Sequence, residues 1–60
     1  MVKVNCRYWH EQVGEVVVLN VVPLYQSYPQ VDAVVFRDTK GGEFCQFADR
    51  FMEQCRKVEG

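Results

Sequence analysis

The sequence predicts a mainly β fold, in which a four-stranded, strongly curved antiparallel sheet is closed by one C-terminal α-helix. Apolar residues fill the block from Val16 to Val22 except at Asn20, so both faces of a strand there are apolar. Turn-forming residues cluster at 38–42, and after residue 46 the apolar period changes from two to about 3.6. A 60-residue chain with a two-faced apolar strand must curve its sheet, cover it with a helix or bury it against a partner.

Two strands are predicted in the first third of the chain. Apolar residues alternate with polar ones from the start, at Val2, Val4, Cys6 and Tyr8. We therefore expect a half-buried strand that runs to about Trp9. Residues 10–14 form a short connection in which Gly14 can supply a positive φ. The second strand spans about 15–22, because its β-branched residues lose side-chain freedom in a helix.

A loop and a hairpin follow. Residues 23–30 contain two prolines and two tyrosines, which predicts a loop or a frayed edge. The third strand is expected at 31–37. Asp38-Thr39-Lys40-Gly41-Gly42 then indicates a hairpin connection, and a short fourth strand covers 43–46.

The C-terminal segment predicts an amphipathic helix over 47–58. One stripe is apolar, and it consists of Phe47, Ala48, Phe51, Met52, Cys55 and Val58. The helix is expected to pack over one face or one open end of the sheet. Residues 1–60 together are expected to form a single small domain.

Composition narrows the classes of function. Seven basic and eight acidic residues are scattered along the chain and give a net charge of −1, which does not indicate a polyanion binder. The start of the chain lacks the apolar core of a signal peptide, and no apolar run reaches the roughly 18 residues of a membrane span. We therefore expect a cytoplasmic protein with its true N-terminus.

The three cysteines are an odd number at wide spacing, which favours reduced thiols packed as small hydrophobes. A zinc site of Cys6, His10, Cys45 and Cys55 is the alternative. Zinc knuckles usually take two ligands a few residues apart from one turn, and neither Cys45 nor Cys55 has such a neighbour. No metal and no cofactor are predicted.

Three segments resemble a family of small uncharacterised bacterial and phage proteins, a domain of unknown function. Its pattern is Tyr-x-His followed by Gly, then Val-Val-Tyr-Arg, then Trp-x-Arg-Pro-x-x-x-Phe. The matching residues are Tyr8-Trp9-His10 with Gly14, Val34-Val35-Phe36-Arg37, and Gly42-Glu43-Phe44 with Phe51.

Two departures fall in the third segment. Phe44 stands for the tryptophan, and Gln46-Phe47 stand for the Arg-Pro, so any role of that arginine is lost here. The resemblance implies a compact, bent SH3-like small barrel and a phage or prophage origin. It implies no activity.

No catalytic role is predicted. His10 follows Tyr8-Trp9 at the end of the first strand, where it is interpreted as a turn histidine hydrogen-bonded to the backbone. Ser27 is the only serine and lies in the expected loop, without the Gly-x-Ser-x-Gly turn of a hydrolase.

The predicted function is protein binding. Trp9, Tyr25 and Tyr28 are aromatic residues without an obvious place in the core, and SH3-type barrels hold peptides in shallow aromatic grooves. With Arg37 they form the predicted partner-binding set of a non-catalytic interaction module or modulator. A small nucleic-acid-binding barrel that stacks bases on sheet-face aromatics is the alternative function. A homodimer through a remaining edge or face is also expected, first at Val16 to Val22.

Overall fold

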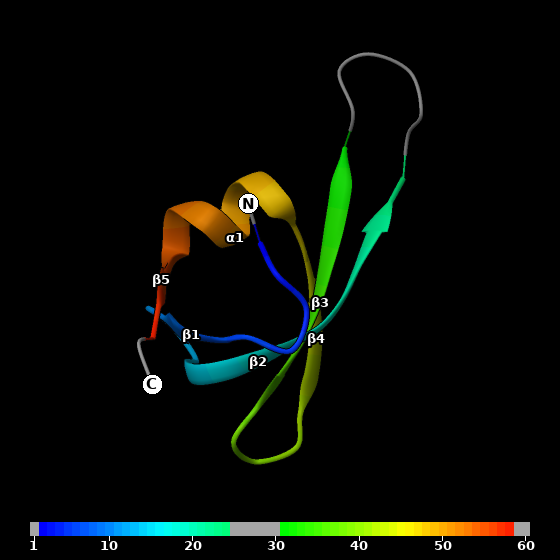
Figure 1. The fold of residues 1–60 in the computed structure, drawn as a ribbon. Coiled ribbons are helices and arrows are strands. Elements are labelled where there is room, and N and C mark those ends of the chain that lie inside the picture. Colours follow the sequence, from blue (N-terminus) through cyan, green and yellow to red (C-terminus); the bar gives the residue numbers. More distant parts are fainter. Residues whose placement is uncertain (1, 25–30, 59–60) are drawn as a thin grey trace.

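The computed structural model describes residues 2–24 and 31–58, and these form five antiparallel strands and one short helix (Figure 1). The strand order across the sheet is β4-β3-β2-β1-β5. The elements in chain order are β1 (Arg7–His10), β2 (Gly14–Pro23), β3 (Asp32–Asp38), β4 (Glu43–Phe47), α1 (Ala48–Gln54) and β5 (Cys55–Lys57).

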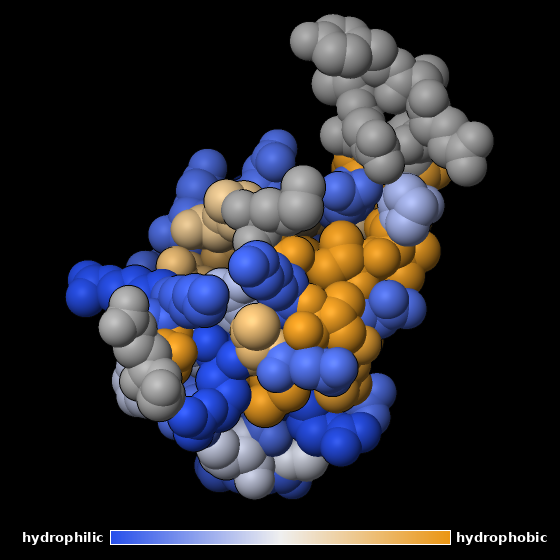
Figure 2. Space-filling model, in the orientation of Figure 1, coloured by the Kyte–Doolittle hydropathy of each residue, from blue (hydrophilic) through white to orange (hydrophobic). Residues whose placement is uncertain are grey.

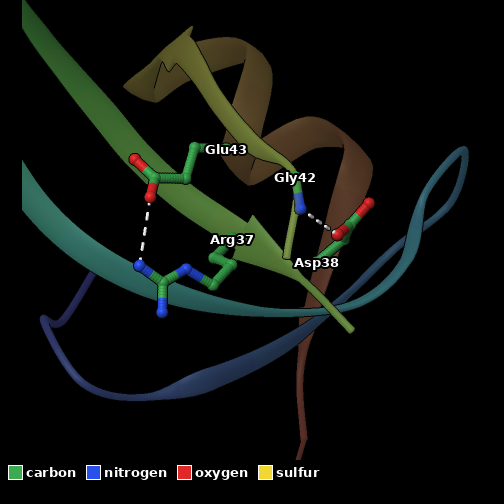
Figure 3. Close-up of polar contacts among 4 residues, drawn as sticks. All are labelled: Arg37, Asp38, Gly42 and Glu43. Carbon is green, nitrogen blue, oxygen red and sulfur yellow. Dashed lines mark hydrogen bonds and ion pairs between the residues drawn. The ribbon is translucent and has the colours of Figure 1, made fainter. Parts of the chain in front are cut away.

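The hairpin between β3 and β4 has the position that the turn-forming residues predict. The Asp38 carboxylate accepts a hydrogen bond from the backbone N–H of Gly42 at 2.7 Å (Figure 3). It also accepts one from the backbone N–H of Lys40 at 3.0 Å. Gly41 has a φ of 88°, a conformation that glycine adopts without steric cost. Local side-chain chemistry therefore closes this turn.

The strand β1 begins later than its alternating pattern predicts. Asn5 has a φ of 66°, in the left-handed region that asparagine tolerates better than most residues, and this interrupts any strand from Val2 onward. Residues 2–6 are nevertheless hydrogen-bonded to the sheet. The Asn5 N–H donates to the Val18 carbonyl at 2.8 Å, and the Lys3 N–H donates to the Tyr8 hydroxyl at 3.1 Å. Val2 and Cys6 pack against the core from outside the strand.

The core lies between α1 and one face of the sheet. Its buried residues are Tyr8, Val16, Val18, Val34, Phe36 and Phe51. The ring of Phe51 lies 5.3 Å from that of Tyr8 and 5.1 Å from that of Phe36, measured between centroids. The side chain of Phe51 thus packs the helix against strands β1 and β3.

The C-terminal helix is shorter than the predicted 47–58, and the sheet has five strands where four were predicted. The helix ends at Gln54, and Cys55 is extended with φ −122° and ψ 150°. Residues Cys55–Lys57 then pair with β1. Pairing gives backbone hydrogen-bond partners to the open edge of β1, which outweighs one further helical turn on a marginal helix.

The sheet is open. β4 and β5 are its two edges, and within the described ranges they do not pair with each other. The barrel-like closure and the strong curvature predicted from the sequence are not confirmed. In the part of the chain described, no helix has the length and apolar character needed to cross a membrane.

Candidate binding surface

The helix covers one face of the sheet and leaves the other without a covering helix in the described part of the chain. The helix covers what we call the inner face, which includes Tyr8, Val18 and Phe36. Side chains alternate along strands, so the register assigns the remaining strand residues to the opposite face. This outer face consists of Arg7, Trp9, Glu15, Val17, Asn20, Val22, Ala33, Val35, Arg37, Glu43, Cys45, Phe47 and Arg56.

The valine strand β2 shows this division most clearly. Val16 and Val18 are buried on the inner face, whereas Val17 and Val22 belong to the outer face. A shift of register between Val18 and Asn20 marks a β-bulge at Leu19, which keeps apolar side chains on the inner face on both sides of it. The described elements therefore cover one face of the strand and leave the other open to solvent.

Trp9 and Arg37, two of the four predicted binding residues, share the outer face. Trp9 is 54% exposed, and its Cη2 atom lies 3.9 Å from where a Cβ on Gly14 would stand. Gly14 has a φ of 93°, so the turn after β1 depends on its glycine. The other two predicted residues, Tyr25 and Tyr28, lie outside the described residues.

Ion pairs hold two arginines on this face. Arg37 Nη2 lies 3.0 Å from Glu43 Oε2 (Figure 3), and Arg7 Nη1 lies 3.7 Å from Glu15 Oε2. All four side chains are at least 40% exposed, so the pairs contribute little to stability. Each pair balances the charge of its arginine.

A groove lies where the β2–β3 hairpin meets the start of α1. Its volume is about 810 Å³, and its lining residues are Leu24, Val31, Asp32, Phe47, Ala48, Asp49, Arg50 and Glu53. The Leu24 N–H donates to the Val31 carbonyl at 2.8 Å, which joins the two sides of the predicted loop. Apolar residues gather along the β2–β3 hairpin on the right of Figure 2.

Sequence patterns missed several exposed apolar residues. Phe47 is 58% exposed and Met52 is 55% exposed, although both belong to the apolar stripe of the predicted helix. Phe47 belongs to β4, so helical spacing did not apply to it. Leu24, at 51% exposed, follows Pro23 within the predicted loop 23–30, and that position was the only sequence signal for it.

His10 has the structural role predicted for a turn histidine. Gln12 N–H donates to its Nδ1 at 3.1 Å, which leaves Nε2 as the donor to Gln46 Oε1 at 3.2 Å. The ring is 3% exposed and stacks on Phe36 at 5.6 Å. Both nitrogens therefore have partners within the fold.

The alternative zinc site of Cys6, His10, Cys45 and Cys55 was tested against the positions of these side chains. Cys6, Cys45 and Cys55 are free thiols, and no group of three or more His, Cys, Asp or Glu side chains within residues 2–24 and 31–58 could hold a metal ion. Burial and, to a lesser extent, the nearby charge of Glu11 raise the pKa of Cys55 to about 11. Its thiol is a weak nucleophile at neutral pH.

No protein-family model, curated protein or solved structure matches the chain.

Proposed function

We propose that the protein is a non-catalytic, cytoplasmic interaction module that binds a protein partner through its outer face. The observation that carries this proposal is the presence of Trp9, Arg37 and Phe47 on a sheet face without a covering helix in the described part of the chain. Aromatic and arginine side chains dominate binding energy at protein interfaces. Tyr25 and Tyr28 are proposed to extend this surface.

The proposal of a non-catalytic role rests on the reactive side chains. Both ring nitrogens of His10 hold structural hydrogen bonds, and the raised pKa of Cys55 disfavours a thiolate nucleophile. The three free thiols are consistent with a reducing compartment.

We also propose that the sheet is SH3-like and that the phage and bacterial family is related. Support comes from β1, which pairs with both β2 and β5, so that the first and last strands are neighbours. Further support comes from the motif residues: Tyr8-Trp9-His10 lie in β1 and Val34–Arg37 lie in β3.

The single tryptophan makes the proposal testable. Trp9 is the only tryptophan, so its fluorescence reports on the outer face. Affinity capture from a lysate of the source cells, followed by mass spectrometry, supplies a candidate partner, which is then purified and titrated into the protein. We expect the Trp9 emission to shift to shorter wavelength and Trp9→Ala to weaken binding at least roughly tenfold.

Met52→Ala is the matched control, because Met52 is 55% exposed like Trp9 but lies on α1. We expect it to bind like the unmodified protein. Equal loss of affinity in both variants, or binding without any change in Trp9 emission, would place the interface elsewhere.

Ion pairing favours a protein partner over nucleic acid on this face, because it compensates two of its three arginines, the third being Arg56. Arg7 and Arg37 are each paired with a glutamate, so their charges are already compensated. Binding to single-stranded DNA or RNA depends on uncompensated cations and weakens with salt. Salt-dependent binding of a labelled oligonucleotide would reverse this preference.

A further inference from the structure

We propose that two copies of the chain pair through the β4 edge, antiparallel and about a two-fold axis at Cys45. This would give a continuous sheet across the dimer. The proposal differs from the partner-binding function, since it uses backbone groups at an edge and leaves the side chains of Trp9 and Arg37 uncovered. Phe47 is common to both proposals: its backbone would pair with the second copy, while its side chain stays on the outer face.

The hydrogen-bonding pattern of β4 identifies its free backbone groups. Asp38 N–H donates to the Gly42 carbonyl at 2.9 Å, which makes 38 and 42 a hydrogen-bonded pair. Such pairs alternate along an antiparallel ladder, so Phe44 and Gln46 are bonded to β3, whereas Glu43, Cys45 and Phe47 face away from it. The N–H and C=O groups of these three residues form the free edge.

This edge is accessible. Glu43, Phe44, Cys45 and Phe47 are all exposed, and within the described ranges no strand pairs with β4 on that side. An exposed row of backbone donors and acceptors is a template for another strand.

The pairing register follows from those three residues. With the axis at Cys45, Cys45 faces its own copy and Glu43 faces the partner's Phe47, so all three outward residues find a partner. Centring the axis on Phe44 or Gln46 would use only two of them. The register also brings no like charges face to face, because Glu43 is the only charged residue of β4 and is already paired with Arg37 at 3.0 Å.

A second copy of β4 fits better than the opposite edge of the sheet. β5 has three residues, of which Arg56 and Lys57 are cationic, so two β5 strands would bring like charges together. Pairing β4 with β5 of another copy would be head-to-tail and open-ended. The β4 to β4 arrangement closes as a dimer without opposing like charges, and it joins the two outer faces on the same side.

Light scattering over a roughly hundredfold dilution series tests the association. We expect a mass that rises toward twice that of the monomer as concentration increases. Cys45→Pro should stay monomeric, because proline removes the central outward N–H yet leaves the bonds between β3 and β4 intact. Cys45→Ser keeps that N–H and should dimerise.

Circular dichroism and thermal unfolding establish that both variants are folded. A monomer at every concentration of the unmodified protein would overturn the proposal, as would equal dimerisation of Cys45→Pro and Cys45→Ser.

Disulfide formation tests the register without the proline variant. Directly opposed residues of a hydrogen-bonded antiparallel pair have Cα atoms about 5.5 Å apart, within the range of a disulfide. In a Cys6→Ala, Cys55→Ala background, diamide should oxidise two Cys45 thiols to one interchain disulfide, while the diamide takes up the two electrons and two protons.

The control moves the single cysteine to the exposed hairpin tip, with Cys45→Ser and Thr39→Cys in the same background. We expect Cys45 to cross-link at least roughly tenfold faster than the relocated thiol of that control at equal concentration, because the two Cys45 thiols are already opposed. Equal rates would mean random collision and would overturn the register.

Discussion

Cys55 and Cys45 show that burial gives two residues of one type different chemistry. Cys45 is exposed on an edge strand, whereas Cys55 is half-buried beside Glu11 and has a pKa of about 11. Sequence reasoning predicted reduced thiols for both and could not rank them, because desolvation depends on the packing of α1 and β5 against the core.

We predict that Cys55 is protected from alkylation in the native protein. At pH 8, a thiol with a pKa of about 11 has roughly one thiolate in a thousand, against roughly one in ten at the ordinary value of 9.0. Iodoacetamide should therefore modify native Cys55 roughly a hundred times more slowly than Cys55 in urea, as peptide mass spectrometry would measure. A ratio near one would contradict the raised pKa, and exposed Cys45 serves as the internal control.

The raised pKa of Cys55 also makes the folded protein less stable at alkaline pH. The unfolded chain ionises Cys55 from about pH 9.0, whereas the folded chain does not ionise it until about pH 11. Stability from this group is thus present below pH 9.0 and is lost as the pH rises toward about 11.

At the scale of elements, prediction succeeded where the signal is local. Asp38, Gly41 and Gly42 form their turn with neighbours in sequence, so residue type alone located it. The end of α1 was missed because the helical spacing of Phe51, Cys55 and Val58 continues past Gln54. The edge of β1, which is distant in sequence, decides between a further helical turn and a short strand.

We predict that α1 depends on Phe51. A seven-residue helix is marginal in isolation, and Phe51 is its only buried residue, at 0% exposed. Phe51→Ala should lower the free energy of unfolding by about 3 to 5 kcal/mol, enough to unfold a domain this small. Met52→Ala, the neighbouring position at 55% exposed, should change it by less than about 0.5 kcal/mol in urea titrations. Similar losses in both variants would show that the helix packs through another face.

At the scale of the whole molecule, the period-two pattern predicted that Tyr8 lies on a buried face, but no pattern showed which face of β2 the helix covers. Trp9, which had no obvious place in the core by sequence, is 54% exposed, and the side chain of Arg37 is 51% exposed. Phe47 and Leu24 were not expected as part of an open surface. Their exposure follows from where one short helix docks on a five-stranded sheet, which no local pattern encodes.

The two faces of the valine strand should therefore respond differently to the same chemical change. Threonine has nearly the shape and the strand propensity of valine but adds a hydroxyl. Val18, at 0% exposed, would bury that hydroxyl, so Val18→Thr should cost about 1 to 3 kcal/mol of unfolding free energy. Val22, at 37% exposed, would keep it hydrated, and Val22→Thr should change stability by less than about 0.5 kcal/mol.

Urea unfolding of these two variants would show whether the two faces of β2 differ in burial. The measurement is made at low protein concentration so that association does not contribute. If Val22→Thr costs as much as Val18→Thr, the outer face is covered in the folded monomer and cannot serve as the proposed binding surface. If only Val18→Thr is destabilised, the strand has one face committed to the core and one available to a partner, which is the arrangement that the protein-binding proposal requires.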